Sequence, residues 1–176
     1  VIQGDNFDNL LEGRGGNDTL NGRDGDDTLN GGGGNDSLTG GGGNDVFVYL
    51  AAADSPASDV ISDFTQGSDK IDFSAFRGTL DLIWSGTTAG TANGIWYDHS
   101  GISTFVHADT DGNGVEDLKI ELIDTPALQL TSADFIGVDN APTISAADAT
   151  GSVTEDATTP DLTTTGSIAF ADVDLS

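Results

Sequence analysis

Aspartates recur at a fixed nine-residue spacing near the start of the sequence, each a short distance after glycines. From Gly13 to Val48 the chain divides into four consecutive blocks: GRGGNDTLN, GRDGDDTLN, GGGGNDSLT and GGGGNDVFV. Every block has Gly first and fourth, Asp sixth and a large apolar residue eighth. Carboxylates and accessible backbone carbonyls are the oxygen ligands that calcium prefers. The sixth positions are Asp18, Asp27, Asp36 and Asp45, and the eighth positions are Leu20, Leu29, Leu38 and Phe47.

Turns and very short strands must position these aspartates. Glycine enters left-handed backbone regions without steric cost, so each Gly-rich hexamer predicts a turn and the last three residues predict a strand. Two blocks then form one coil of a parallel solenoid, in which equivalent residues stack about 4.8 Å apart. Asp18 would lie over Asp36, and Asp27 over Asp45. Carboxylates about 5 Å apart repel by roughly 3 kcal/mol at an effective dielectric near 20, so the stack needs a cation between its layers.

An imperfect fifth unit precedes the four regular blocks. We predict that it spans Gln3 to Leu11, with Asp8 as its aspartate and Leu10 as its apolar residue. Asn6 then stands where the other blocks have their fourth-position glycine, and Glu12 is an inserted residue.

The blocks resemble the hemolysin-type RTX nonapeptide, G-G-x-G-x-D-x-U-x, whose form is a calcium-loaded parallel β-roll. The resemblance implies that aspartate side chains bind calcium and that carbonyls of the Gly-rich turns complete the shell. A flexible linker rich in Gly and Asp is the alternative, and it describes the calcium-free state better. The implied ligands are Asp8, Gly13, Gly15, Gly16, Asp18, Gly22, Asp24, Gly25, Asp27, Gly31, Gly33, Gly34, Asp36, Gly40, Gly42, Gly43 and Asp45.

Composition excludes several other classes of protein. The 30 acidic residues outnumber the 5 basic ones and give a formal charge of −25, which argues against any nucleic acid partner. No apolar run approaches the roughly 20 residues that span a bilayer, and the first residues show no signal-peptide pattern, so membrane insertion is not expected. The chain has no cysteine, so a bound metal would be held by oxygen, which favours calcium or magnesium over zinc.

Residues 49–138 hold both Trp and both Tyr and predict a series of short strands. The succession of DVFVY, DVISDF and GSDKIDFSAF resembles the C-terminal region of the serralysin family of secreted proteases, and so does the closing LTSADFI. In that family this region caps the β-roll. The resemblance makes Asp59, Asp63 and Asp69 candidate calcium ligands, although solvation of turns and strand edges would explain them equally well.

A predicted hairpin has arms at 102–108 and 117–123 and an acidic loop between them. The loop places oxygens as an EF-hand does, but Ile120 stands where an EF-hand needs a bidentate Glu. We predict either a weak calcium site or an ordinary turn stabilised by Asx side chains. The candidate ligands are Asp109, Asp111, Asn113 and Asp117.

Catalysis is not expected. The zinc-binding H-E-x-x-H of the serralysin proteases is missing, since His99 and His107 lie in the contexts DHS and VHA. We expect His107 on a strand face of the hairpin. The aromatic residues Trp84, Trp96 and Tyr97 could bind a carbohydrate, but core packing is the commoner role of such side chains.

Residues 139–176 resemble the opening of a VCBS repeat, an Ig-like β-sandwich module, and stop before its sheets are complete. We therefore predict an all-β chain: a calcium-binding parallel β-roll (1–48), a serralysin-like β cap (49–138) and a partial Ig-like tail (139–176), disordered or only partly stranded. The predicted function is calcium-induced folding in a bacterial protein exported by type I secretion machinery to the extracellular space or cell surface. A large RTX adhesin that meets surface glycans or a host or biofilm matrix is the favoured parent. The alternative is an accessory module of a secreted protease, lipase or polysaccharide epimerase.

Overall fold

The computed structural model describes residues 1–54, 58–76, 81–123, 128–140, 143–147 and 168–171. These residues form β-strands and three short 3-10 helices, which confirms the all-β prediction. Among them, no helix is long and apolar enough to cross a membrane. The chain forms two compact units, Val1–Asp139 and Asn140–Ser176.

The elements of the roll and the cap follow in chain order. The roll contains β1 (Ile2–Gln3), β2 (Leu10–Glu12), β3 (Thr19–Asp24), β4 (Thr28–Asn30), β5 (Ser37–Gly42), β6 (Val46–Val48), β7 (Asp59–Ile61) and β8 (Lys70–Asp72). The cap contains β9 (Leu82–Gly86), β10 (Gly94–Ser100), β11 (Ser103–Ala108), β12 (Leu118–Ile123), β13 (Phe135–Ile136) and β14 (Val138–Asn140). The 3-10 helices are η1 (Ala52–Asp54), η2 (Ser74–Phe76) and η3 (Ser132–Asp134).

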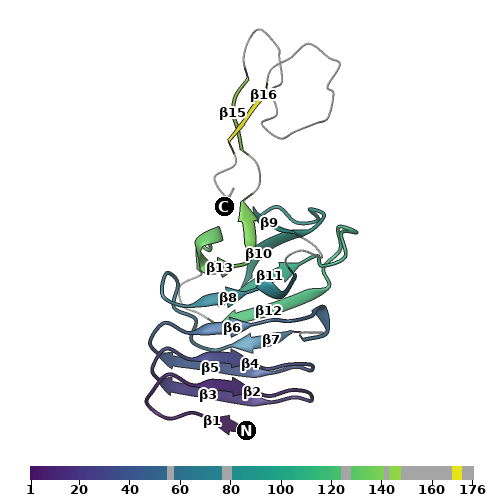
Figure 1. Cartoon of the computed structure of the whole chain (residues 1–176). Coiled ribbons are helices and arrows are strands. Elements are labelled where there is room, and N and C mark those ends of the chain that lie inside the picture. Colours follow the sequence, from purple (N-terminus) through teal and green to yellow (C-terminus); the bar gives the residue numbers. More distant parts are fainter. Residues whose placement is uncertain (55–57, 77–80, 124–127, 141–142, 148–167, 172–176) are drawn as a thin grey trace. The chain divides into compact units, whose positions relative to one another are not determined.

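The roll consists of two parallel sheets between which the chain alternates (Figure 1). Odd strands β1, β3, β5 and β7 follow one another in one sheet, and even strands β2, β4, β6 and β8 in the other. Leu20 pairs with Leu38, and Leu29 pairs with Phe47. The predicted stacking of every second nonapeptide is therefore confirmed.

The first unit lies one residue later than the sequence prediction placed it. Leu11, not Leu10, pairs with Leu29, and Leu11 is 7% exposed while Leu10 is 68% exposed. The unit is thus Gly4–Glu12, a full nonapeptide without an insertion, and Glu12 is its ninth residue. Side chains alternate between the two faces of a strand, so a shift of one residue would turn Leu10 inward and Leu11 outward. The observed register instead places Leu11 in the core, paired with Leu29.

The eighth-position side chains fill the space between the two sheets. Beyond Phe47 the regular spacing ends, yet the same column of apolar residues continues, because Ile61 pairs with Leu38 and Ile71 pairs with Phe47. Each fully buried side chain of this kind stabilises the folded state by about 1.5–3 kcal/mol relative to an exposed one. The buried members of the column are Leu11, Leu20, Leu29, Leu38, Phe47, Ile61, Ile71 and Phe135.

The cap continues both sheets of the roll. Strand β7 pairs in parallel with β12, and β12, β11 and β10 follow as antiparallel neighbours. The predicted hairpin is confirmed by β11 and β12. On the other sheet β13 pairs with β8, and η3 precedes β13 directly. The cap therefore covers the end of the roll that follows β7 and β8.

In the second unit, β15 (Thr143–Ala147) and β16 (Ile168–Ala171) form an antiparallel pair. Most of the predicted VCBS-like tail, including 148–167 and 172–176, lies outside the described residues. The VCBS resemblance stays a prediction.

Candidate metal centres

Two rows of side chains run along the turns of the roll, one on each side. In both rows a backbone N–H of one coil donates to a carboxylate oxygen, Oδ1, of the next coil. Donor–acceptor distances are 2.7 and 2.9 Å in the first ladder and 2.8, 2.9 and 3.0 Å in the second. The first ladder is Asp18, Asp36 and Asp59, and the second ladder is Asn9, Asp27, Asp45 and Asp69.

The other carboxylate oxygen lacks a donor at three ladder positions. Oδ2 of Asp27, Asp36 and Asp45 is buried and accepts no hydrogen bond from the part of the chain that the structure describes. Burying an unpaired charged oxygen is strongly unfavourable unless a proton or a cation meets it. These three atoms therefore mark places where the fold requires positive charge.

Backbone carbonyls converge on the same places because the first residue of each turn is glycine. A methyl group on Gly22 would lie 2.0 Å from Oδ2 of Asp27 and 2.5 Å from the carbonyl oxygen of Gly40 in the next coil. At Gly13 such a group would lie 2.4 Å from the carbonyl oxygen of Gly31. Carboxylate and carbonyl oxygens of successive coils thus face a common space. A set of ligands that consists only of oxygens and carries negative charge fits calcium.

The remaining glycines shape the turns. The carbonyls of third-position Gly33 and Gly42 accept N–H groups of the preceding coil at 2.7 and 2.8 Å. The fourth-position glycines all have positive φ, a region that favours glycine. Their φ values are 100°, 117°, 141° and 145° at Gly16, Gly25, Gly34 and Gly43. Gly15 forms an isolated parallel bridge with Gly33.

The ladder carboxylates are electrostatically poised for a cation. Burial, reinforced by neighbouring carboxylates, raises the pKa of Asp45 to about 6 and that of Asp59 to about 7. Burial also raises the pKa of Asp27, Asp36 and Asp69. Backbone N–H bonds lower these pKa values without cancelling the rise. Ionised aspartates are therefore unfavourable in the ordered roll until positive charge joins them.

We expect the calcium-free roll to gain structure as the pH falls from about 7.5 to about 5. The ordered state holds protons more tightly than the unfolded chain, so this stabilisation is complete below the unfolded pKa of 3.8. It is lost as the pH rises through about 6 for Asp45 and about 7 for Asp59. Calcium competes with these protons, so calcium addition near pH 6 should release protons, measurable by pH-stat titration. A chelated chain equally unfolded from about pH 5 to about pH 8 would contradict the expectation.

Asp59 and Asp69 extend the two ladders beyond the regular repeats, but Asp63 has a different place. The Asp63 carboxylate accepts the N–H groups of Gly40 and Gly41 at 3.0 and 2.8 Å. Asp59 stands 23 residues after its ladder neighbour and Asp69 stands 24 after its own. Asp63 therefore holds the start of a turn, while the other two continue the pattern of the repeats.

Two more of the expected aspartate ligands in the roll lie outside both ladders. Asp8 is the fifth residue of its unit, and its carboxylate accepts the N–H of Asp26 at 2.9 Å on the exposed side of the turn. Asp24 is exposed and accepts an amide N–H of the preceding coil at 3.0 Å. The sixth position belongs to Asn9, whose side-chain oxygen accepts the N–H of Asp5 at 2.7 Å. Asn9 could not be predicted as a ladder residue from the sequence, because it is not a carboxylate and the predicted register places Asp8 at the sixth position.

Residues 8–137 match the family described as Peptidase M10 serralysin C terminal. The chain belongs to this family. Domains of this family are non-catalytic, and serralysin-type β-rolls bind calcium. Among curated proteins, no sequence matches the chain.

The solved structures that are similar to this serralysin C-terminal domain include two subunits of a mannuronan C5-epimerase of Azotobacter vinelandii. The AlgE6R2 subunit is 28% identical with a TM-score of 0.53, and the match covers 78% of this chain and 92% of that one. The AlgE6R3 subunit is 29% identical with a TM-score of 0.51, covering 92% and 93%. Together with the family match they support a calcium-binding β-roll module of type I-secreted proteins.

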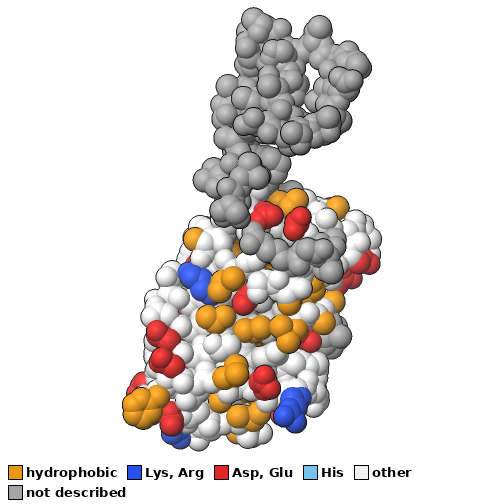
Figure 2. Space-filling model, in the orientation of Figure 1, with side chains coloured by type: hydrophobic (Ala, Val, Ile, Leu, Met, Phe, Trp, Pro, Cys, Tyr) orange, Lys and Arg blue, Asp and Glu red, His pale blue; other side chains and the backbone are white. Residues whose placement is uncertain are grey.

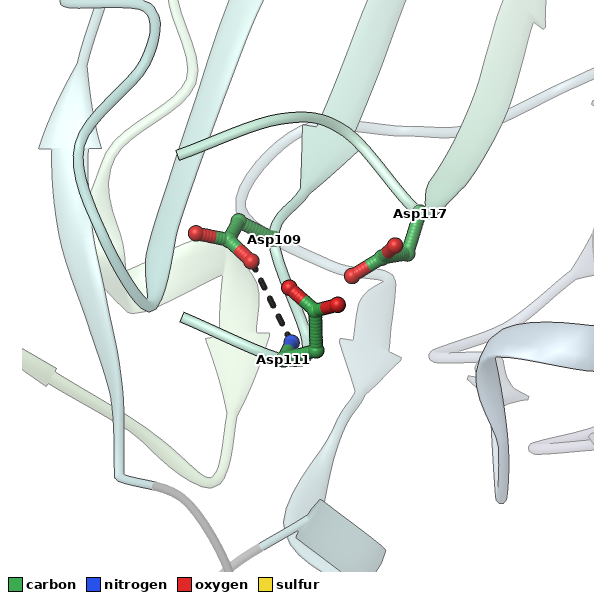
Figure 3. Close-up of side chains that lie close together, drawn as sticks. All are labelled: Asp109, Asp111 and Asp117. Atoms are coloured by element: carbon green, nitrogen blue, oxygen red, sulfur yellow. Dashed lines mark hydrogen bonds between the residues drawn. The ribbon is translucent and has the colours of Figure 1, made fainter. Parts of the chain in front are cut away.

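The hairpin loop of the serralysin C-terminal domain brings Asp109, Asp111 and Asp117 together, with one oxygen of each within 4.8 Å of the others (Figure 3). Asp111 donates its backbone N–H to Asp109 at 3.2 Å. The oxygen of the Asn113 side chain accepts the N–H of Val115 at 2.7 Å, and Asp117 accepts the N–H of Thr110 at 2.8 Å. The structure thus gathers three of the four predicted loop ligands in a turn built on Asx side chains.

Asp109 differs from the ladder aspartates because its carboxylate already has donors. Backbone N–H groups of Asp111 and Gly112 donate to Oδ1, and those of Gly114 and Asn93 donate to Oδ2, at 2.7–3.2 Å. Burial alone would raise the pKa of Asp109, but these four bonds together lower it. We infer that Asp109 holds the loop as a structural anion.

Replacing Asp109 by asparagine should therefore destabilise the cap with or without calcium. The amide NH2 would face two backbone N–H donors, a loss of about 2–4 kcal/mol for a fully buried group. Asp111→Asn is the matched control, because Asp111 is exposed and its bonds stay within the loop. Urea unfolding of both variants in calcium and in chelator measures the difference. A loss at Asp109 that appears only in calcium would favour a metal site instead.

The aromatic side chains of the serralysin C-terminal domain stack on one another. Trp84 stacks on Tyr97 with ring centroids 5.8 Å apart, and Trp96 stacks on His107 at 5.5 Å. His107 lies on a face of β11, as expected, and its Nε2 is 3.3 Å from a carboxylate oxygen of Asp98. These rings contribute to packing inside the cap.

Proposed function

We propose that this chain is a calcium-folded module of a protein exported by type I secretion. It stays unfolded where calcium is scarce and forms its β-roll where calcium reaches the about 0.1–1 mM range of extracellular modules. The observation that carries the proposal is the set of buried Oδ2 atoms at Asp27, Asp36 and Asp45 that accept no hydrogen bond from any described residue.

The residues proposed to hold calcium lie in the ladders and in the first position of each turn. The carboxylates come from successive coils, and the carbonyl of the next coil's first glycine faces the same space. Bound calcium supplies the positive charge that offsets repulsion between carboxylates of neighbouring coils. The proposed ligand residues are Asp18, Asp27, Asp36, Asp45, Asp59 and Asp69 through their carboxylates, and Gly22, Gly31 and Gly40 through their backbone carbonyl oxygens.

The energetics of the chain make ordering depend on the ion. In the unfolded chain, aspartates and glycine carbonyls are scattered, so the sites exist only in the ordered roll. Binding free energy then becomes folding free energy. Without it, the buried Asp45 and Asp59 carry raised pKa values and the Gly-rich turns lose much conformational entropy on ordering. A Gly-rich acidic chain that stays unfolded in the cell is suited to threading through an exporter.

We propose the extracellular space as the place where this module works, and the accessory module of a secreted enzyme as its setting. The similar AlgE6 subunits belong to an epimerase, which favours this setting over an adhesin. The adhesin interpretation rests on the VCBS-like tail, most of which lies outside the described residues. Stacking of Trp84, Trp96 and Tyr97 on other rings leaves no observation that favours a glycan.

Far-UV circular dichroism during a calcium titration tests the proposal. From chelated buffer to about 10 mM calcium, we expect a cooperative gain of β signal, with a midpoint in the about 0.1–1 mM range. Magnesium should not replace calcium, because it demands octahedral geometry and keeps its waters. A spectrum already folded in chelator and unchanged by calcium would rule out calcium-induced folding.

A further inference from the structure

One coil of the roll departs from the repeat at a position that faces the first ladder. Gly13 and Gly31 are first-position glycines one coil apart, and the equivalent residue of the following coil is Tyr49. The N–H of Gly13 donates to the carbonyl of Asn30 in the next coil at 2.8 Å. In the same way, the N–H of Tyr49 donates to the carbonyl of Asp72 in the next coil at 3.0 Å. A phenol side chain thus stands where the regular coils have no side chain.

A side chain at this position points at the ladder carboxylate of its own coil. A methyl group on Gly31 would lie 2.2 Å from Oδ2 of Asp36, so a regular coil has no room for one. In the coil of Tyr49 the connection is longer. Asp36 follows Gly31 by five residues, whereas Asp59 follows Tyr49 by ten. The exchange of glycine for tyrosine therefore coincides with a connection long enough to accommodate the ring.

The ring of Tyr49 is held in the core, and its hydroxyl meets the Asp59 carboxylate. Tyr49 is 2% exposed, and its ring lies against Phe73 with centroids 5.9 Å apart. Burial raises the pKa of Tyr49 well above its ordinary value, and the charge of Asp59 and the hydrogen bond to it raise this pKa further. No other described residue forms a hydrogen bond with this hydroxyl. The phenol is therefore a donor directed at one ladder carboxylate.

Packing alone does not call for a hydroxyl at this place. The other rings of the cluster belong to Phe73, Phe76 and Phe135, which bring no polar atom into the core. Burying a hydroxyl costs free energy unless it finds a hydrogen-bond partner. The hydroxyl of Tyr49 is thus explained by Asp59 and not by the ring cluster.

The hydroxyl does not remove the need for a cation at this level of the ladder. Asp36 and Asp59 are 2% and 1% exposed, whereas Figure 2 shows other acidic side chains on the visible surface of the roll, where solvent screens them. After burial, the charge of Asp54 is among the causes that raise the pKa of Asp36 and of Asp59. A neutral hydroxyl satisfies a lone pair of Asp59, but it cannot offset the charge of three carboxylates. Oδ2 of Asp36 still accepts no hydrogen bond from any described residue.

We propose that Tyr49 is a positioning residue for calcium, whose hydroxyl holds the Asp59 carboxylate toward an ion between Asp36 and Asp59. The inference rests on the proposed function, because it assigns a partner to one of the ligands proposed there. Groups that hydrogen-bond to the carboxylate ligands of a metal orient those ligands, and their loss typically costs about 10–100-fold in metal affinity. Tyr49 supplies this orientation where a longer connection replaces the glycine turn.

Tyr49→Phe tests the inference, because it removes the hydroxyl and keeps the ring. The calcium midpoint of folding, followed by circular dichroism, should rise about tenfold. Because binding and folding are coupled, any loss of stability would also raise this midpoint, so a second measurement must report on the ion itself. NMR of bound cadmium, a divalent ion close to calcium in size, gives a resonance for each site. We expect Tyr49→Phe to shift the resonance of one site far more than the others.

Tyr97→Phe is the matched control. It makes the same change at the other tyrosine of the chain, which lies in β10 and stacks on Trp84 in the cap. It should leave the cadmium resonances in place. The same variant keeps Tyr49 as the single tyrosine, so its tyrosine Raman bands report one hydroxyl. We expect the bands of a hydroxyl that donates to a carboxylate, and a change in them when strontium replaces calcium.

The outcomes separate this inference from the proposed function. If Tyr49→Phe folds in calcium and every cadmium resonance keeps its place, the positioning role is overturned and calcium-induced folding stands. Raman bands of a hydroxyl without an acceptor, or bands that strontium leaves unchanged, also overturn the role, even where Tyr49→Phe does not fold. If the dichroism of the unaltered chain does not respond to calcium, the proposed function is overturned, and the positioning role with it.

Discussion

Asp45→Asn is expected to shift stability in opposite directions with and without calcium. Asp45 is fully buried in the second ladder, accepts the N–H of Asp27 at 2.9 Å and donates its own N–H to Asp69 at 3.0 Å. An amide keeps an oxygen for the first bond but removes the charge. In chelator the variant should be more ordered, because a buried carboxylate with a raised pKa is gone. In calcium its folding midpoint should rise at least about tenfold, since two adjacent inter-coil spaces lose a ligand.

Asp26→Asn provides the matched control for this variant. Asp26 lies one coil before Asp45, next to the ladder residue Asp27, is exposed, and accepts the N–H of Asn44 at 2.8 Å, a bond that an amide oxygen preserves. Its calcium midpoint should move less than about twofold, as expected for a screened surface charge. The measurement is calcium-titrated circular dichroism of both variants, with residual structure recorded in chelator. Equal shifts in the two variants would show that net charge matters and ladder position does not.

Gly34→Ala is expected to abolish calcium-induced folding throughout the about 0.1–1 mM range. Gly34 has a φ of 141°, which side chains rarely adopt, and a methyl group there would lie 2.3 Å from the carbonyl oxygen of Gly16 in the preceding coil. The clash would force two coils apart at a point where their spacing sets the distance between ladder oxygens. The combined strain of several kcal/mol is comparable with the whole stability of a small domain.

Gly16→Ala separates the backbone strain from the clash. Gly16 holds the same fourth position with a φ of 100°, but a methyl group there meets nothing within 4 Å because Gly16 lies in the end coil. We expect this variant to fold in calcium with a midpoint raised only a few-fold, by the roughly 1–2 kcal/mol cost of positive φ. Similar behaviour of the two variants would mean that close approach between coils is not what requires glycine.

The roll could be predicted from the sequence because its geometry repeats with its composition. Glycine at the first and fourth positions and an apolar eighth residue fix the turn, the inward side chain and the stacking partner at once. The first unit was placed wrongly because it departs at the marker positions: Phe7 replaces the fourth glycine and Asn9 replaces the aspartate. With both markers lost, the adjacent Leu10 and Leu11 allow two registers, and only burial distinguishes them.

Other parts of the site depend on contacts that periodicity does not contain. Asp59 and Asp69 join the ladders at spacings of 23 and 24 residues, because the loops before them are longer than a nonapeptide turn. The loop spacing of the hairpin suggests a metal site, yet Asp109 is satisfied partly by the N–H of Asn93, which comes from a preceding loop. Sequence spacing reveals which oxygens a loop offers, but not which donors from elsewhere already use them.

The parallel stacking also means that order should spread along the roll from one coil to the next, beginning at the coil beside the cap. Each coil contacts only the coils before and after it. The conformational entropy that a coil loses on ordering is therefore offset by its contacts with the adjacent coil. At the cap, β7 pairs with β12 and β8 pairs with β13, which gives the nearest coil a rigid template. At the other end β1 and β2 have a neighbour on one side only. Amide hydrogen exchange should therefore slow coil by coil from the N-terminus toward the cap, and opening should begin at β1.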